Sequence, residues 1–301
     1  MQTFGPVGEP GDGPQQSAAS TTIASGQPVY FNMRDSADVI KVSGSGKNKQ
    51  ITRQSMESTE PGWQTVQVGN ELFQAQENTK SCRWVSLSGA ARPEKPTITE
   101  HLGFAMAKHE GEFIFICGGQ GNKFAERFNV QSKIWEAMPE LNEPRCYAGA
   151  CVLNSNLYVF CGMNGEDLFS SIEVMTNACG PQQGMNFWQT INFTEAQLFP
   201  RYAPAVAMLN NAEILIMGGN SYVDDDLSSL GDVMIFNVET QQIERKIQNF
   251  PGLLSFQAVG NKCMQFEPDT VVALVEDVEQ TKAMVVEYKK GTKMVRCLQK
   301  L

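Results

Sequence analysis

The side chains that most often carry out chemistry are few in this chain and widely scattered. Its 301 residues include two histidines, His101 and His109, and eight cysteines without a CxxC pair. The histidines flank one short apolar segment, which as a strand at about 3.3 Å per residue places them on the order of 20 Å apart. They cannot share a metal ion, and no Cys/His pair has the spacing of zinc ligands. The acidic run Asp224–Asp226 is typical of a solvated loop, so we expect no metal and no cofactor.

Cationic residues recur at one position of a repeated pattern. Each stands 17 residues ahead of a glycine: His101 before Gly118, Arg145 before Gly162 and Arg201 before Gly218. Between cation and glycine lie a half-apolar segment, a polar turn and a run of apolar residues such as 113–117. Such a run between turn signals indicates a strand buried on both faces. Residue pairs seven apart, such as Phe128 and Trp135, indicate a third and a fourth strand.

The unit of four short antiparallel strands, repeated every fifty or so residues, resembles a kelch repeat. The resemblance is closest over 100–248 and weaker over 27–99 and 249–301, where the Gly-Gly doublet is missing. It implies an all-β, six-bladed kelch-type β-propeller with four antiparallel strands per blade, five blades being the alternative. Second strands are expected near residues 30, 73, 116, 160, 216 and 273. Helix should make up less than about 5% of the chain.

The two ends are expected to behave differently from the repeats. Residues 1–20 are rich in Gly, Pro, Gln and Ser, which predicts a flexible tail that adds little to stability, with the propeller spanning 21–301. Two ways of closing the ring remain open. Either Thr21–Ser25 forms the first strand of blade 1 and the ring closes by packing, or an N-terminal segment pairs with the last blade.

Composition restricts the partners and the compartment. A net charge of −9 and a pI near 4.9 argue against nucleic acid. A local basic edge lies near the C-terminus at Lys289, Lys290, Lys293, Arg296 and Lys300. No run approaches 18 apolar residues, so no membrane span is expected. The cysteines, with Cys117 and Cys161 at equivalent strand positions, are interpreted as reduced core residues, and no disulfide is expected. The start of the sequence is not a secretory signal, and a cytoplasmic location follows.

The kelch resemblance also implies a ligand-binding face. In kelch propellers the loops before the first strand and after the Gly-Gly doublet open on the same side, around the central channel. Carried onto this sequence, the first set of loops nominates His101, Arg145, Tyr147, Arg201 and Tyr202. The second set nominates Gln120, Asn122, Asn164, Glu166, Asn220 and Tyr222. For the two arginines an alternative interpretation stays open, in which they bond loop carbonyls and tie the blades together.

Two functions are compatible with these residues. The first is a non-catalytic protein-interaction scaffold, a subunit or adaptor of a larger intracellular assembly, with cytoskeletal and ciliary assemblies among the candidates. Its protein partner would bind through the loop face or the blade edges. The alternative is a sugar-modifying enzyme of the epimerase or lyase type that uses Arg, Tyr and a carboxylate in the channel. Convergence of Arg145, Arg201, Glu166 and His101 into one enclosed pocket favours the enzyme, and spread over an open rim favours the scaffold. Self-association is left undetermined.

Overall fold

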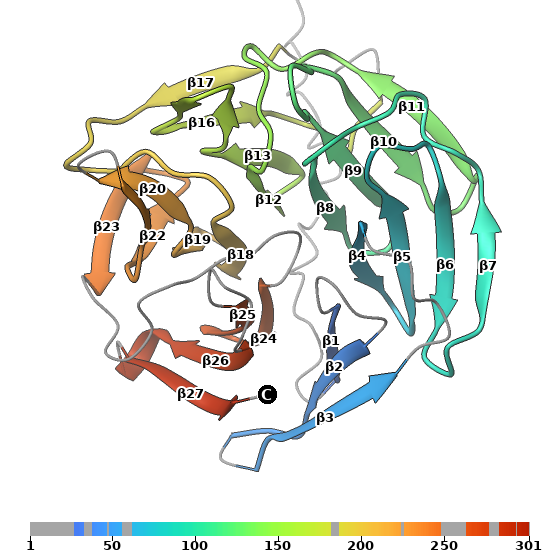
Figure 1. Cartoon of the computed structure of the whole chain (residues 1–301), viewed down its shortest axis with the longest axis horizontal. Helices are drawn as coiled ribbons and strands as arrows, with labels where there is room; N and C mark the ends of the chain where they lie inside the picture. Colours follow the sequence, from blue (N-terminus) through green and yellow to red (C-terminus); the bar gives the residue numbers. More distant parts are fainter. Residues whose placement is uncertain are drawn as a thin grey trace, which may run out of the picture.

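Six β-sheets are arranged as blades around a central channel in the computed structural model (Figure 1). The structure describes residues 27–32, 38–46, 48–55, 62–181, 187–223, 226–247, 263–276, 283–292 and 294–300. Across these residues helical structure is confined to the 3-10 turn η2 (Lys290–Thr292). The all-β, six-bladed prediction is confirmed, and the five-bladed alternative is wrong. The boundary between tail and propeller lies outside the described residues.

The first three blades succeed one another in chain order, each built of antiparallel neighbours. Blade 1 contains β1 (Val29–Asn32), β2 (Asp38–Ser43) and β3 (Gln50–Ser55). Blade 2 contains β4 (Trp63–Val68), β5 (Glu71–Gln76), β6 (Cys82–Ser86) and β7 (Ala91–Glu94). Blade 3 contains β8 (Ala105–His109), β9 (Phe113–Cys117), β10 (Ala125–Asn129) and β11 (Ile134–Met138).

The last three blades follow the same plan, and two of them carry an extra hairpin. Blade 4 contains β12 (Gly149–Leu153), β13 (Asn156–Phe160), β16 (Ser171–Met175) and β17 (Gln189–Asn192), with the hairpin β14 (Met163–Asn164) and β15 (Asp167–Leu168). Blade 5 contains β18 (Ala205–Asn210), β19 (Glu213–Met217), β22 (Val233–Asn237) and β23 (Gln242–Ile247), with the hairpin β20 (Asn220–Val223) and β21 (Asp226–Ser229). Blade 6 contains β24 (Cys263–Glu267), β25 (Thr270–Glu276), β26 (Ala283–Lys289) and β27 (Met294–Lys300).

Residue pairs seven apart mark the third and fourth strands, as predicted. Directly opposed partners include Phe128 with Trp135 and Tyr288 with Val295. Blade 1 corrects the prediction for residue 30. We expected 29–31 to be a second strand, but β1 contacts β4, the inner strand of blade 2, in the way that β4 contacts β8. It therefore occupies the innermost position, and β2 is the second strand of that blade.

The hydrophobic core lies between the blades, not within any one of them. Six clusters of buried apolar side chains fill the six interfaces between neighbouring blades. Phe73, for example, packs on Trp84 within blade 2 and on Phe128 of blade 3. Because every sheet is covered on both faces, the second strands read as continuous apolar runs.

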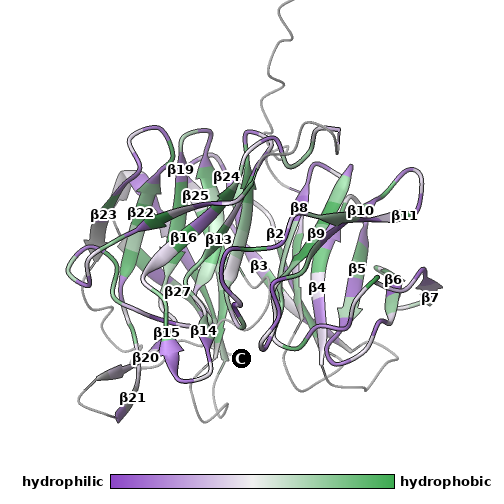
Figure 2. Cartoon of the chain, turned by 90° about the horizontal axis from the view of Figure 1, so that it is seen from above, coloured by the Kyte–Doolittle hydropathy of each residue, from purple (hydrophilic) through white to green (hydrophobic). Residues whose placement is uncertain are grey.

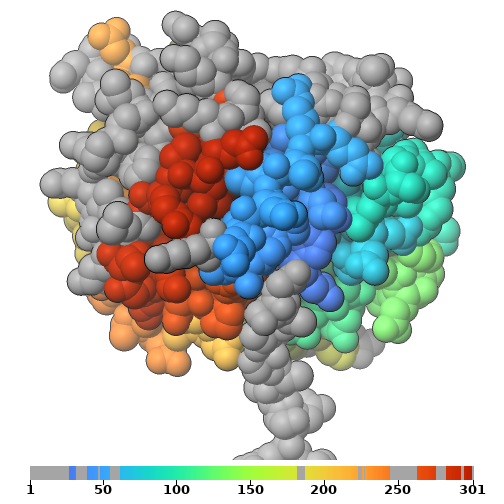
Figure 3. Space-filling model, turned by 90° about the horizontal axis from the view of Figure 1, so that it is seen from below, coloured from blue at the N-terminus to red at the C-terminus, as the bar shows by residue number. Residues whose placement is uncertain are grey.

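The ring closes where blade 6 meets blade 1, side by side in Figure 3. Apolar residues of both blades, including Phe31, Ile40 and Phe266, share one cluster. Lys49 of blade 1 pairs with Glu287 of blade 6. Across the described residues no strand pair joins the two blades. The role expected for Thr21–Ser25 lies outside the described residues. No helix in the described part of the chain is long and apolar enough to span a membrane.

Candidate partner-binding face

Both kinds of nominated loop lie on one side of the propeller. The hairpins β14–β15 and β20–β21 project from this side (Figure 2). Each hairpin is bridged to the loop that precedes the first strand of its own blade, through Cys146 with Met163 and through Tyr202 with Asn220. We call the surface formed by residues 100–104, 119–124, 140–148, 162–170, 199–204, 218–223 and 226–232 the loop face.

The three repeated cations are buried beneath this face and neutralised within their own blades. Arg145 is 1% exposed, and its Nε donates to Glu173 over 2.8 Å. Arg201 is fully buried, and its two terminal nitrogens donate to both oxygens of Asp232 at 2.6 and 3.0 Å. Because each guanidinium is enclosed and paired, neither presents its charge to solvent. The geometry supports the interpretation that these arginines tie loops together.

His101 supplies the same kind of tie in blade 3. Its Nδ1 lies 2.6 Å from the carbonyl oxygen of Gly118, and its Nε2 lies 2.7 Å from Glu126. Both ring nitrogens therefore lie within hydrogen-bond distance of an oxygen of the same blade. Glu126 also accepts from the backbone amides of Ile98 and Thr99. The imidazole ring of His101 here occupies the place that a guanidinium takes in the next two blades.

The cations bind one repeated backbone carbonyl, and this corrects the sequence register. His101 meets the carbonyl of Gly118 and Arg201 donates to that of Gly218, whereas Arg145 donates to that of Cys161, not Gly162. Cys161 adopts φ of 57°, close to the 69° and 58° of the two glycines. The expected equivalence of Cys117 and Cys161 is therefore wrong, because Cys161 replaces the first glycine of the doublet.

Glycine is required here because neighbouring backbones approach closely. A Cβ on Gly118 would lie 2.3 Å from the carbonyl oxygen of Arg145, which belongs to the next blade. The amide of Gly119 donates to that same oxygen over 2.7 Å, and Gly162 donates to Arg201 over 2.9 Å. These bonds link blade 3 to blade 4 and blade 4 to blade 5 beneath the loop face.

A second set of bonds joins the three blades beside the channel. The amide of Tyr147 donates to Gly103 and the amide of Ala203 donates to Tyr147, both over 2.6 Å. All three residues have positive φ, of 65°, 52° and 53° in chain order. Tyr147 is therefore equivalent to Ala203, not to Tyr202, although the two tyrosine rings lie 6.2 Å apart between centroids. Both tyrosines are half-buried.

The remaining nominated residues differ in accessibility. Gln120, Glu166 and Tyr222 are exposed, with Tyr222 at 46%. Asn122 and Asn164 are half-buried, and the side chain of Asn122 caps its own loop by accepting from the amide of Phe124. Asn220 is fully buried, and its side-chain oxygen accepts from the hydroxyl of Ser229 over 2.6 Å. The structure thus separates a buried framework from a smaller set of accessible side chains.

Sequence reasoning missed the acidic partners and one exposed aromatic residue. Glu126 and Glu173 are carboxylates within third strands whose residues are mostly buried, and both positions can be read in the sequence. Phe124 is 46% exposed in the loop after Gly119, on the same face as Tyr222. Exposed aromatic side chains are enriched in protein interfaces, so Phe124 belongs among the candidate contact residues.

The described residues show no metal site, and their buried cysteines are unreactive thiols. They contain no group of three His, Cys, Asp or Glu placed to hold a metal ion. All eight cysteines lie in described segments and are free thiols. Burial raises the pKa of the Cys161 thiol to about 11 and that of Cys151 to about 12. Such thiols stay protonated near neutral pH and are poor nucleophiles.

Comparisons with known proteins agree with the repeat and the fold. The kelch motif matches residues 144–175, the part of blade 4 from the arginine loop to the end of β16. No curated protein matches the chain. A solved structure titled "Structure of YjhT" is similar with a TM-score of 0.66 and 9% identity, covering 93% of this chain and 99% of its own. At that identity the likeness shows the fold alone. The propeller fold itself is compatible with both a protein-interaction role and an enzymatic role.

Proposed function

We propose that the chain is a protein-interaction scaffold whose loop face binds a protein partner. The observation that carries the proposal is the set of accessible side chains on three successive blades. Phe124 extends from blade 3, Glu166 from blade 4 and Tyr222 from blade 5. Exposed aromatic residues surrounded by polar groups are the usual composition of a contact surface.

The buried ties beneath these side chains prepare the surface for binding. The ion pairs of His101, Arg145 and Arg201, together with the backbone bonds between blades, restrain the loops before any partner arrives. A restrained surface loses less conformational entropy on association, which strengthens binding. In this proposal the three cations act by positioning the loops, and the exposed residues make the contacts.

The charge of the loop face indicates what kind of partner it fits. Glu143, Glu166, Asp167 and Asp226 are exposed on it. A surface with this sign attracts a basic surface and raises the rate of encounter at low salt. We therefore propose a partner with a basic contact surface, as a component of a larger intracellular assembly. Cytoskeletal and ciliary assemblies are candidates that identification of the partner will test.

The enzyme alternative receives less support from the geometry. A sugar epimerase or lyase requires Arg, Tyr and a carboxylate that converge on a substrate. Arg145 and Arg201 are each enclosed with their own acid in separate blades, whereas Glu166 is exposed in the turn between β14 and β15. The two arginines and Glu166 therefore do not converge on one enclosed pocket. Such convergence would favour the enzyme, and its absence among these residues favours the scaffold.

Affinity capture with matched variants tests the proposal. The first variant combines Phe124→Ala, Tyr222→Ala and Glu166→Lys on the loop face. The control combines Ile134→Ala, Phe187→Ala and Glu110→Lys, which are exposed at the opposite ends of the strands. We expect the first variant to lose the proteins captured by the tagged wild type, and the control to retain them. If the control variant loses the captured proteins and the first variant retains them, the loop face is not the binding surface.

A further inference from the structure

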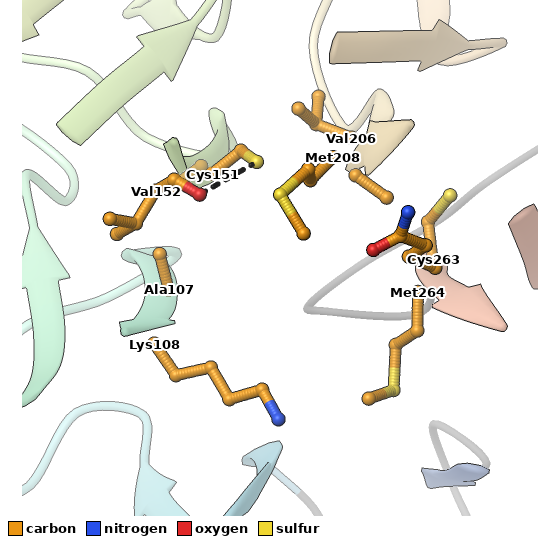
Figure 4. A pocket seen from close by; sticks show the side chains of 11 residues that line it. Ala107, Lys108, Cys151, Val152, Val206, Met208, Cys263 and Met264 are labelled. Atoms are coloured by element: carbon orange, nitrogen blue, oxygen red, sulfur yellow. Dashed lines mark hydrogen bonds between the residues drawn. The ribbon is translucent and has the colours of Figure 1, made fainter. Parts of the chain in front are cut away.

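A small cavity lies in the channel between the inner strands, and none of its lining residues belongs to the loop face. It has a volume of about 90 Å³ and is lined from β8, β12, β18 and β24. Its wall is mainly apolar and includes Val152, Val206, Met208 and Met264. Figure 4 shows the side chain of Lys108 extended toward the space between these residues. This lysine is the one charged side chain of the lining.

The ammonium of Lys108 is poorly compensated within the protein. It donates to the backbone carbonyl of Gln67 in blade 2, and the described residues place no carboxylate within ion-pair distance of it. Burial lowers the pKa of Lys108 from 10.5 to about 8, and no neighbouring charge counteracts that shift. The other titratable lining groups are the thiols of Cys151 and Cys263, whose pKa values burial raises, so both are neutral. A buried cation without a counterion favours the binding of an anion.

The same cavity holds a buried acceptor without a donor. Gln265 is 8% exposed, and its amide nitrogen donates to the carbonyl of Leu209 over 2.8 Å. Its side-chain oxygen is buried and has no hydrogen-bond partner. Leaving such an oxygen unpaired is unfavourable, so a donor from a ligand would be bound favourably there. Cation and acceptor together specify a ligand that carries both an anionic group and a donor.

We propose that the channel cavity binds a small hydroxy-monocarboxylate, with its carboxylate on Lys108 and its hydroxyl donating to Gln265. The volume of about 90 Å³ is large enough to hold several water molecules or a ligand of a few non-hydrogen atoms. Glycolate has that size and both groups. This site is independent of the loop face and of its proposed partner.

Ligand titrations with matched compounds test the proposal. Glycolate is compared with acetate, which lacks the hydroxyl, and with ethylene glycol, which lacks the charge. For the wild type we expect glycolate to bind at least about tenfold more tightly than acetate, a difference of about 1.4 kcal/mol. Ethylene glycol should not bind. Gln265→Leu should reduce glycolate to the affinity of acetate, and Lys108→Met should abolish binding of both carboxylates.

A second measurement keeps the proposal testable without variants. In the folded wild type, the pKa of Lys108 followed by NMR should rise by about one unit or more at saturating glycolate, because a bound anion stabilises the charged amine. An unchanged Lys108 pKa at about 20 mM glycolate, or equal glycolate binding by Lys108→Met, would overturn the site and leave a cavity filled by water. Neither outcome bears on protein capture by the loop face.

Discussion

Removal of the Arg145 side chain is the perturbation whose effect the structure defines most fully. In Arg145→Met, Glu173 keeps its position at 0% exposure but loses the guanidinium that lies 2.8 Å away. The hydroxyl of Ser171 and the carbonyl of Cys161 lose their donors at 2.8 and 2.9 Å. Breaking a buried ion pair by removing one partner costs about 3–5 kcal/mol, since the other charge stays buried. We expect a loss of that size in the free energy of unfolding.

Denaturant unfolding followed by intrinsic fluorescence measures this loss, with Gln120→Met as an exposed control that should change stability by less than about 0.5 kcal/mol. Adding Glu173→Gln to Arg145→Met removes the unpaired charge. The amides of Asn142 and Glu143 donate to different oxygens of Glu173, so the glutamine keeps an acceptor for one of them. The double variant should therefore be more stable than Arg145→Met alone. A loss below about 1 kcal/mol for Arg145→Met would refute the assignment of this residue as a buried tie.

Three further predictions follow from single positions. Gly118→Ala should destabilise the protein by more than about 2 kcal/mol, because its Cβ meets a backbone oxygen at 2.3 Å and φ is 69°. At Gly46, where φ is 54° and an added Cβ would meet no atom within 4 Å, Gly46→Ala should lower the free energy of unfolding by only about 1–2 kcal/mol. Equal losses for Gly118→Ala and Gly46→Ala would contradict the close contact at Gly118. Because burial depresses the pKa of Lys108 to about 8, the unfolded chain binds more protons between pH 8 and 10.5. The free energy of unfolding of the wild type, measured from denaturation curves, should therefore lie furthest below that of Lys108→Met at pH values under 8. The difference should shrink as the pH rises and vanish by pH 10.5. A difference that does not change with pH would show that Lys108 is not buried. With a thiol reagent at pH 8, the exposed Cys297 should react quickly and the buried Cys151, with its pKa raised to about 12, only after unfolding, and fast labelling of Cys151 would refute its burial.

The repeat was predictable because residue spacing survives where residue identity changes. In blades 3, 5 and 6 the opposed pairs, such as Phe236 and Ile243, keep a separation of seven residues, because the turn between the third and fourth strands has the same length in these three blades. The register of blade 4 was not predictable from glycine alone. Cys161 adopts the left-handed conformation that Gly118 and Gly218 adopt in neighbouring blades. The sequence contains one glycine there, and its alignment with the wrong member of the doublet moved the register by one residue.

The candidate site was predictable in its location and not in its accessibility. The repeated cations at His101, Arg145 and Arg201 correctly marked the loops of one face. Their burial depends on acids that lie 25, 28 and 31 residues further along the chain. The separations differ because blades 4 and 5 insert hairpins, and in blade 5 the acid is Asp232, just before the third strand. No fixed spacing connects a cation to its partner, so only the folded structure shows which charges are neutralised.

Hydrogen–deuterium exchange of the partner complex tests directly whether the loop face is the surface that binds the partner. We expect slower exchange in the loops 119–124, 162–170, 218–223 and 226–231 when the partner is bound, because contact on the loop face excludes solvent from their amides. The turns 109–112 and 238–241, which lie at the opposite ends of the strands, should exchange at the same rate in the free and bound protein. Protection of those two turns with unchanged exchange in the three loops would contradict the assignment of the loop face as the binding surface.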